Sequence, residues 1–200
     1  MLSFNNVTYQ ISNKCILKDF NYRFDTGVYI LQGESGIGKT TLLNLSCGYL
    51  LPDAGTIERK RNSRISYMFQ EDMLFHNLTV RENMNIKCNA VDMNDDVREG
   101  KIEQYCSNFK ISDKMDCLVS SLSGGEKKRV QLAMLAMDDC EIWLLDEPIA
   151  NLDSENCALI MDYLFSLNSK LILIVSHQFI EKNNQKFTLL EMKDGGINEK

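Results

Sequence analysis

The stretch that decides the fold is Gly33-Glu34-Ser35-Gly36-Ile37-Gly38-Lys39-Thr40. It fits the pattern G-x-x-x-x-G-K-[ST] of a phosphate-binding loop, the P-loop. A β-rich segment, Val28 to Gln32, precedes it, and an apolar segment, Thr40 to Cys47, follows it and stops before Gly48. A strand, a glycine loop and a helix in this order place backbone N–H groups and the positive helix end around one anion. The sequence therefore predicts a site for a phosphate chain.

Two side chains of the P-loop carry its polar chemistry. Lys39 is expected to pair with the β- and γ-phosphates of a nucleotide, and the hydroxyl of Thr40 is expected to bind Mg²⁺. The glycines allow backbone conformations that other residues avoid, so the N–H groups can approach the phosphates closely.

A second chemical signal is the apolar segment Ile142 to Leu145, which ends in Asp146 and Glu147. Strands often end in acidic turns, so this pair alone would be a weak signal. Beside a P-loop it is typical of a Walker B element. Asp146 is then expected to hold Mg²⁺ directly or through water, and Glu147 is expected to polarise an attacking water.

The composition limits the classes of protein to which the chain can belong. Its 200 residues, 44% hydrophobic and 25% charged, suit one sizeable globular domain. The longest aliphatic run, Leu171 to Val175, is far shorter than the ~20 residues that cross a bilayer, so the chain is not itself a channel or carrier. A net charge of 22 − 28 = −6 argues against non-specific nucleic-acid binding. The basic group Arg59, Lys60, Arg61 and Arg64 is interpreted as a solvated hairpin turn.

The cysteines indicate neither a disulfide framework nor a zinc site. There are seven of them, and no two have C-x-x-C spacing. Reduced thiols in a cytosolic protein are the expected state. The N-terminus has no basic region followed by a long apolar stretch, so no signal peptide is expected.

The chain changes character in its middle. Short β-rich segments come first, and from about Glu71 to Leu122 the composition favours helices, with Thr79 and Glu82 forming a predicted capping box. Apolar strands and helical spacing then alternate, which predicts a mostly parallel sheet. We expect a single domain over residues 1–200, with a catalytic core at about 1–70 and 138–200 and a helical subdomain at about 71–137.

The segment Leu122-Ser123-Gly124-Gly125-Glu126 indicates one family. Here the chain resembles the nucleotide-binding domain of ATP-binding cassette (ABC) proteins, whose signature is LSGGQ or LSGGE. The resemblance covers essentially the whole chain, with the motifs in the family's order. The remaining motifs are the adenine-stacking aromatic Tyr9, the Q-loop residue Gln70, the D-loop Asn151-Leu152-Asp153, and Ser176-His177 with the switch histidine.

The resemblance implies an α/β fold of the P-loop NTPase (RecA-like) type. Its core would be a mostly parallel sheet, with an N-terminal antiparallel β subdomain and an inserted helical subdomain that carries the signature. The chain would be an ATPase subunit of an ABC transporter.

The resemblance also implies a site for ATP and Mg²⁺. Tyr9 would stack on adenine, Gln70 would reach Mg²⁺ or its water, and His177 would hydrogen-bond the γ-phosphate and the attacking water. The expected catalytic set is Glu147, His177, Lys39 and Gln70, and the expected metal ligands are Thr40, Gln70 and Asp146. The expected nucleotide contacts are Tyr9, Gly33, Glu34, Ser35, Gly36, Ile37, Gly38, Lys39, Thr40, Thr41, Ser123, Gly124, Gly125 and Glu126.

The partners follow from the same resemblance. In this family two domains meet head to tail, and each ATP lies between the P-loop of one and the signature of the other, so a homodimer or pseudo-dimer is expected. A separate transmembrane permease would form the pore, and its coupling helix would contact the helical insert near Gln70. The chain would then be cytoplasmic and peripheral on the inner face of the cell membrane, with no nucleic-acid partner.

Two alternatives stay open. An ABC ATPase that moves no solute, such as the ATPase of iron–sulfur cluster assembly, is also a single cassette. A non-catalytic nucleotide sensor is disfavoured by the presence of both Glu147 and His177. Met134 and Ala150 stand where the family usually has arginine and serine, which leaves the turnover rate open. The sequence indicates neither the cargo nor the direction of transport.

Overall fold

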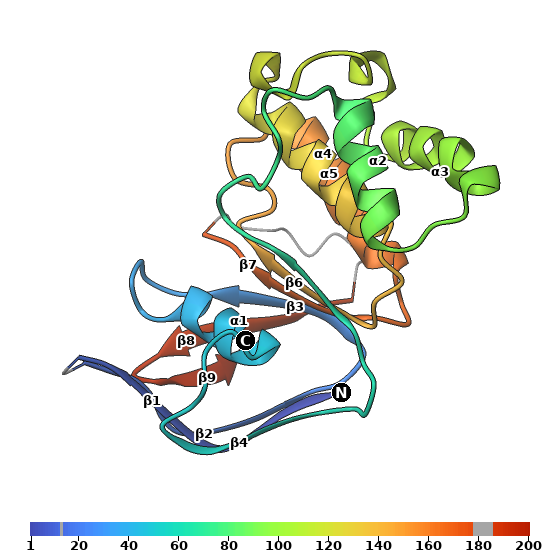
Figure 1. The fold of residues 1–200 in the computed structure, drawn as a ribbon. Coiled ribbons are helices and arrows are strands. Elements are labelled where there is room, and N and C mark those ends of the chain that lie inside the picture. Colours follow the sequence, from blue (N-terminus) through green and yellow to red (C-terminus); the bar gives the residue numbers. More distant parts are fainter. Residues whose placement is uncertain (13, 178–185) are drawn as a thin grey trace. The chain divides into compact units, whose positions relative to one another are not determined.

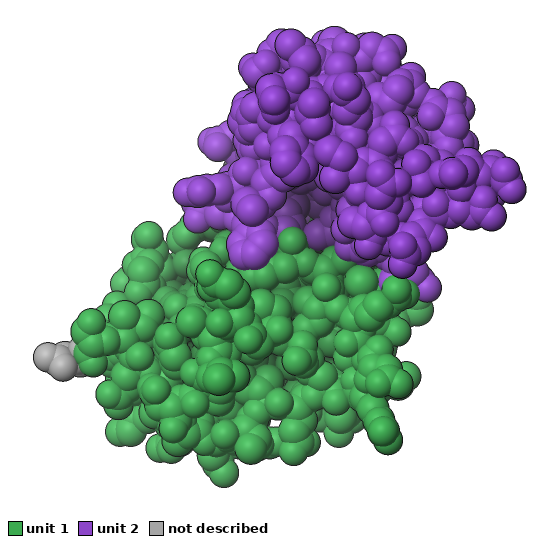
Figure 2. Space-filling view, in the orientation of Figure 1, with its two compact units in different colours: residues 1–67, 140–147, 164–200 green, residues 68–139, 148–163 purple. Residues whose placement is uncertain are grey.

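The computed structural model describes residues 1–12, 14–177 and 186–200 (Figure 1). These residues form two compact units (Figure 2). Unit 1 contains residues 1–67, 140–147 and 164–200, and unit 2 contains residues 68–139 and 148–163. Residues 148–163 group with unit 2, where Tyr163 packs against Phe109 with 4.7 Å between the ring centroids. The division into a catalytic core and a helical subdomain stays a prediction.

A six-stranded sheet runs through unit 1 in the order β5-β6-β7-β3-β8-β9. Its central strand β3 pairs in parallel with both β7 and β8, β6 pairs in parallel with β7, and β9 pairs antiparallel with β8. Every residue of β6 and β7 is buried, as in parallel strands inside an α/β protein. The predicted mostly parallel sheet is therefore confirmed. The strands are β3 (Gly27–Gln32), β5 (Ile65–Met68), β6 (Ile142–Asp146), β7 (Leu171–Val175), β8 (Thr188–Lys193) and β9 (Gly196–Glu199).

A separate three-stranded antiparallel sheet, β2-β1-β4, lies in the same unit. It consists of β1 (Leu2–Ile11), β2 (Lys14–Phe24) and β4 (Ala54–Arg59), and it confirms the predicted N-terminal antiparallel part. The interpretation of the basic segment as a hairpin turn was wrong. Arg59 ends β4 in this sheet, whereas Arg64 comes just before β5 in the other sheet, so the segment links two sheets.

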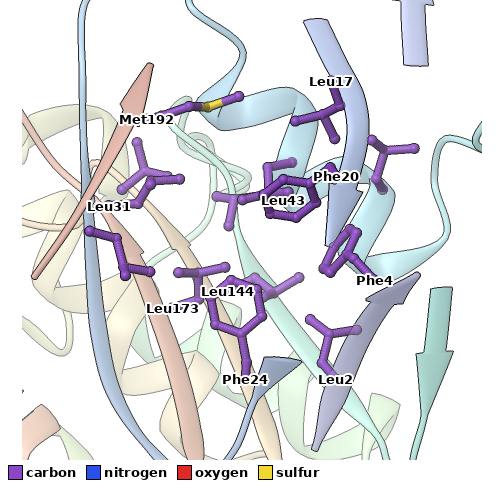
Figure 3. Packing of buried hydrophobic residues seen from close by; sticks show 14 of the residues in the cluster. Leu2, Phe4, Leu17, Phe20, Phe24, Leu31, Leu43, Leu144, Leu173 and Met192 are labelled. Atoms are coloured by element: carbon purple, nitrogen blue, oxygen red, sulfur yellow. The ribbon is translucent and has the colours of Figure 1, made fainter. Parts of the chain in front are cut away.

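The core of unit 1 lies between these elements and helix α1 (Lys39–Cys47) (Figure 3). Phe4 packs edge to face against Phe20, with 5.2 Å between the ring centroids. Leu43 of α1 and Leu144 of β6 are both fully buried in the same cluster. Because the helix that follows the P-loop is held by this packing, the position of the loop is set by the core.

Unit 2 is helical. Helix α2 begins with the predicted capping box, in which the Thr79 side chain accepts from the Glu82 N–H and the Glu82 side chain accepts from the Thr79 N–H. Helix α4 begins with an equivalent box between Ser123 and Glu126. The helices are α2 (Val80–Ala90), α3 (Asp95–Asn108), α4 (Gly124–Ala136) and the first part of α5 (Ser154–Ser166), with short 3₁₀ helices at Ser112–Lys114 and Val119–Ser121. Within the described ranges, no helix combines the length and the apolar character needed to span a membrane.

The core packing of unit 1 can be tested with Leu144→Ala. Truncating this fully buried leucine is expected to lower the free energy of unfolding by about 2–5 kcal/mol, because it leaves a cavity in a close-packed cluster. Urea unfolding followed by the fluorescence of Trp143, the chain's single tryptophan and Leu144's neighbour in β6, measures this loss. Leu51→Ala is the control, because Leu51 is 78% exposed and its truncation should change the midpoint little.

Candidate functional site

The parallel pairing in unit 1 brings three motifs to one edge of the sheet. The P-loop follows β3, Asp146 and Glu147 stand at the end of β6, and His177 follows β7. Strand β7 lies between the other two, with Val175 paired both to Leu31 of β3 and to Asp146 of β6. Since the carboxyl ends of parallel strands meet at the same edge, this is where ligands bind in open α/β sheets.

Two glycines of the P-loop are required by close contacts. Gly38 has a φ of 118°, and a Cβ there would lie 2.3 Å from a methyl group of Ile16. Gly33 has a φ of 152°, and a Cβ there would lie 2.9 Å from the Met192 carbonyl oxygen. Any other residue at either position would displace its neighbours, so the loop conformation depends on glycine.

The N-terminus of α1 is left free for an anion. Its cap residue, Gly38, offers no side-chain hydrogen bond, and the first turn holds no acidic residue. Helices α2 and α4 differ, because Glu82 and Glu126 neutralise their first turns. The positive end of the α1 dipole and its unpaired N–H groups are thus suited to bind phosphate.

Lys39 is a buried cation in this loop. Only 5% of the residue is exposed, and its Nζ donates to the carbonyl oxygens of Gly33 at 2.8 Å and Glu34 at 2.9 Å. Burial lowers the pKa of the Lys39 ammonium, and the nearby Glu147 and Asp146 oppose that shift. An anion placed at the loop would restore the stabilisation that the ammonium loses by leaving water.

Thr40 and Asp146 form an oxygen pair suited to Mg²⁺. The Thr40 hydroxyl donates to Asp146 Oδ2 at 2.7 Å, and Asp146 is 2% exposed. Hydroxyl and carboxylate oxygens are the protein ligands of this hard cation, which usually completes its shell with water and substrate phosphate. The residues described here contain no cluster of three histidine, cysteine or acidic side chains that could hold a metal. Thr40 and Asp146 offer two oxygen ligands of the kind that such a cation takes.

Glu147 lies beside Asp146 in a strained conformation. Its φ is 53°, in the left-handed region that non-glycine residues rarely adopt, and it is 7% exposed. Burial raises the pKa of the Glu147 carboxyl; His177 and Lys39 oppose the increase, and Asp146 adds to it. Such outliers cluster at functional sites, where the surrounding structure maintains them.

One oxygen of Glu147 has no hydrogen-bond partner among the described residues. Oε1 is buried, and its 3.5 Å contact with Nε2 of His177 is within ion-pair range but too long for a hydrogen bond. Oε2 receives only a long contact, also 3.5 Å, from the His177 backbone N–H. An unsatisfied buried carboxylate oxygen beside a phosphate-binding loop is an acceptor for a water proton.

The structure thus brings together Lys39, Thr40, Asp146, Glu147 and His177 within unit 1. Tyr9 is in β1 of the same unit, half-buried and paired with Leu17 across the hairpin.

Other predicted site residues belong to unit 2. Ser123 is the N-cap of α4, and both Ser123 and Gly124 are exposed. Gln70 is also exposed, and its backbone carbonyl accepts from Nζ of Lys128 at 2.6 Å. The P-loop, by contrast, belongs to unit 1.

One contact of the loop was not predicted from the sequence. Lys14, the first residue of β2, donates from Nζ to the Gly36 carbonyl at 2.9 Å. No motif marks Lys14, because the contact depends on how β2 packs against the loop. Only the position of Ile16 two residues later, against Gly38, shows that this strand faces the site.

Comparison with known proteins agrees with this geometry. A sequence model of the ABC transporter family matches residues 17–150. The thiamine import ATP-binding protein ThiQ of Haemophilus influenzae is 34% identical over 213 aligned positions, covering 100% of this chain and 98% of the relative. The lipoprotein-releasing system ATP-binding protein LolD of Buchnera aphidicola is 33% identical, covering 85% and 82%. The Nod factor export ATP-binding protein I of Burkholderia lata is 32% identical, covering 90% and 64%.

Solved structures agree on the fold. A dimeric ATP-binding cassette in a post-hydrolysis state, bound to ADP and Pi, superposes with a TM-score of 0.86 at 24% identity, covering 100% of this chain and 98% of that one.

The fold and the site define a P-loop ATPase. The chain belongs to the ABC transporter family, in which it is an ATP-binding and ATP-hydrolysing subunit. The family match ends before the D-loop and the switch histidine and begins after Tyr9, so it does not cover those positions.

The P-loop assignment can be tested with Lys39→Ala. The variant is expected to lose ATP binding, by about a hundredfold or more in affinity, because it removes charge-assisted hydrogen bonds to the phosphates. Calorimetric titration with ATP measures the change. Lys60→Ala, at an exposed position in the loop after β4, is the control and should bind as the unaltered chain does. Unchanged affinity in Lys39→Ala would contradict the assignment.

Proposed function

We propose that this chain powers transport through a separate transmembrane permease, by binding MgATP between two ABC cassettes, as a homodimer or a pseudo-dimer with a second ABC domain, and hydrolysing it. The observation that carries the proposal is the cluster at the sheet edge, where the P-loop lysine Lys39, the Thr40–Asp146 oxygen pair and a buried Glu147 oxygen with no hydrogen-bond partner among the described residues lie together. The relatives named above act in import and in export of different cargoes, so they support transport without indicating the cargo.

The proposed chemistry uses this chain's own groups. Water attacks the γ-phosphorus of ATP, its proton passes to a Glu147 oxygen, and the bond from the γ-phosphorus to the bridging oxygen of ADP breaks. Lys39 neutralises the phosphate oxygens, and His177 would hydrogen-bond the γ-phosphate. Mg²⁺, held by Thr40 and Asp146 with Gln70 as a further ligand, would supply positive charge at the phosphates.

The raised pKa of Glu147 predicts the acid side of the pH profile. A general base must be ionised, so hydrolysis is lost as the pH falls through the folded-state pKa of Glu147, which lies above the ordinary glutamate value of about 4.3. Initial ATPase rates at saturating MgATP across a pH series should therefore decline at a higher pH than an exposed carboxylate would give. Glu147→Gln should lower the rate about 10²–10⁴-fold and abolish this decline.

The proposed head-to-tail dimer can be tested with the same variant. Without its base, Glu147→Gln should bind ATP without consuming it, and it also removes a negative charge next to the γ-phosphate. It should therefore accumulate with ATP and Mg²⁺ as a dimer of about twice 22.9 kDa, measured by size-exclusion chromatography with light scattering. Adding Ser123→Arg should prevent the dimer, because the side chain would intrude on the partner's γ-phosphate. A Glu147→Gln chain that stays monomeric at saturating ATP while hydrolysing normally would contradict both roles.

The membrane partner is proposed on the same basis. The permease is proposed to be a separate polypeptide, and the helical insert near Gln70 is proposed to receive its coupling helix. The chain would be cytoplasmic and held peripherally at the inner face of the cell membrane. Fractionation of cells tests this, because a transport subunit sediments with membranes through its partner. A chain found only in the soluble fraction would favour a role such as iron–sulfur cluster assembly.

A further inference from the structure

A chain of hydrogen bonds in unit 2 joins helix α4 to the start of α5. Arg129 Nη1 donates to Asn156 Oδ1 at 2.5 Å, and Asn156 Nδ2 donates to Asp153 Oδ2 at 2.6 Å. The orientation of the Asn156 amide is fixed by chemistry, since a guanidinium only donates and a carboxylate only accepts. The two ends of this link are the helix that begins at the signature and the last residue of the D-loop motif.

A second contact joins the same two motifs. Gly125 of the signature faces Leu152 of the D-loop, where an added Cβ would lie 2.9 Å from a Leu152 methyl carbon. The signature and the D-loop are therefore tied at two points, by apolar packing near Ser123 and by the polar link at Arg129.

The side-chain bonds of Asn156 can be removed without removing the cap at the start of α5. Asp153 Oδ1 accepts from the Asn156 backbone N–H at 2.9 Å, which is the usual interaction of a capping residue with the third helical position. Any residue at position 156 except proline provides that N–H. The side chain of Asn156 is needed only for the bonds to Arg129 and to the second oxygen of Asp153.

Arg129 depends on this partner. Its Nε is buried without a hydrogen bond, and no acidic side chain in the described segments forms an ion pair with it. The Asn156 carbonyl is thus the acceptor that holds the guanidinium in one orientation. Arg129 is partly buried, and a guanidinium in such a place that loses its acceptor is expected to shift.

We propose that Asn156 is a positioning residue that holds the signature and the D-loop in one fixed arrangement, so that both meet the partner cassette's ATP together. This inference rests on the proposed ATP-dependent dimer. Asn156 belongs to none of the nucleotide-binding motifs and acts through Arg129 and Asp153.

The test compares Asn156→Ala with Glu155→Ala, each in the Glu147→Gln background. Alanine keeps the backbone N–H and favours helix, so the cap of α5 remains. Glu155→Ala is the matched control, because it removes only an exposed ion pair with Lys110 one residue earlier on the same turn. The ATP concentration that gives half-maximal dimer, read by light scattering, should rise about tenfold for Asn156→Ala and remain unchanged for Glu155→Ala.

Two further measurements separate positioning from a loss of folding. ATP affinity of the monomer should be unchanged in Asn156→Ala, because the P-loop belongs to unit 1. In an Arg129→Met background, Asn156→Ala should have little further effect on dimer formation, since residues that act through one bond are not additive. Asn156→Asp, which keeps an acceptor for Arg129 but places a carboxylate against Asp153, should be impaired less than Asn156→Ala.

Each outcome decides the matter. If Glu147→Gln dimerises with ATP and Asn156→Ala leaves the half-maximal concentration unchanged, the inference is overturned and the proposed function stands. The inference would also be overturned if Asn156→Ala raised the half-maximal ATP concentration equally in chains with Arg129 and in the Arg129→Met background. If Glu147→Gln itself forms no dimer, the proposed function fails and the inference fails with it.

Discussion

The parallel pairing of β6, β7 and β3 is the constraint on which the rest of the site depends. The P-loop and the Walker B acids are far apart in the chain, and the Thr40–Asp146 hydrogen bond joins residues 106 positions apart. That bond can form because the carboxyl ends of parallel strands end at one edge, and Val175 fixes the register of both neighbours. An antiparallel arrangement of the same strands would place the two motifs at opposite edges.

Burial at this edge of the sheet affects the ionisation of the charged side chains as well as their positions. Lys39 and Glu147 are both removed from water, and burial shifts the pKa of each toward its neutral form. The charge of each group also opposes the pKa shift of the other, so the two charges partly offset the effect of burial. A phosphate chain at the loop would supply counter-charge to the Lys39 ammonium, and the proposed divalent cation would supply it to the Glu147 carboxylate. Binding of both would therefore lower the remaining cost of burial.

The sequence predicts the parts of this structure that local pattern governs. The P-loop with its flanking strand and helix, the Thr79–Glu82 cap and the acids that end β6 all follow from spacing and residue type over a few positions. The roles assigned to Tyr9, Gln70 and the signature residues stay predictions. The placement of Lys14 against Gly36 and the division of the basic segment between two sheets were missed. Both depend on tertiary contacts, to which a single sequence gives no local signal.

The signature shows how one residue can serve the fold and remain available for function. Ser123 Oγ accepts from the Glu126 N–H at 3.3 Å, and Glu126 in turn accepts from the Ser123 N–H at 2.8 Å, so this box closes the start of α4. The Ser123 hydroxyl also donates to the Glu126 carboxylate, and this bond helps to lower the pKa of that carboxyl. Ser123 is exposed, and the two backbone N–H bonds of the box do not use the hydroxyl hydrogen. A phosphate oxygen of the proposed partner cassette that took this hydrogen from Glu126 would therefore leave both N–H bonds in place, so binding in trans would not require α4 to unwind.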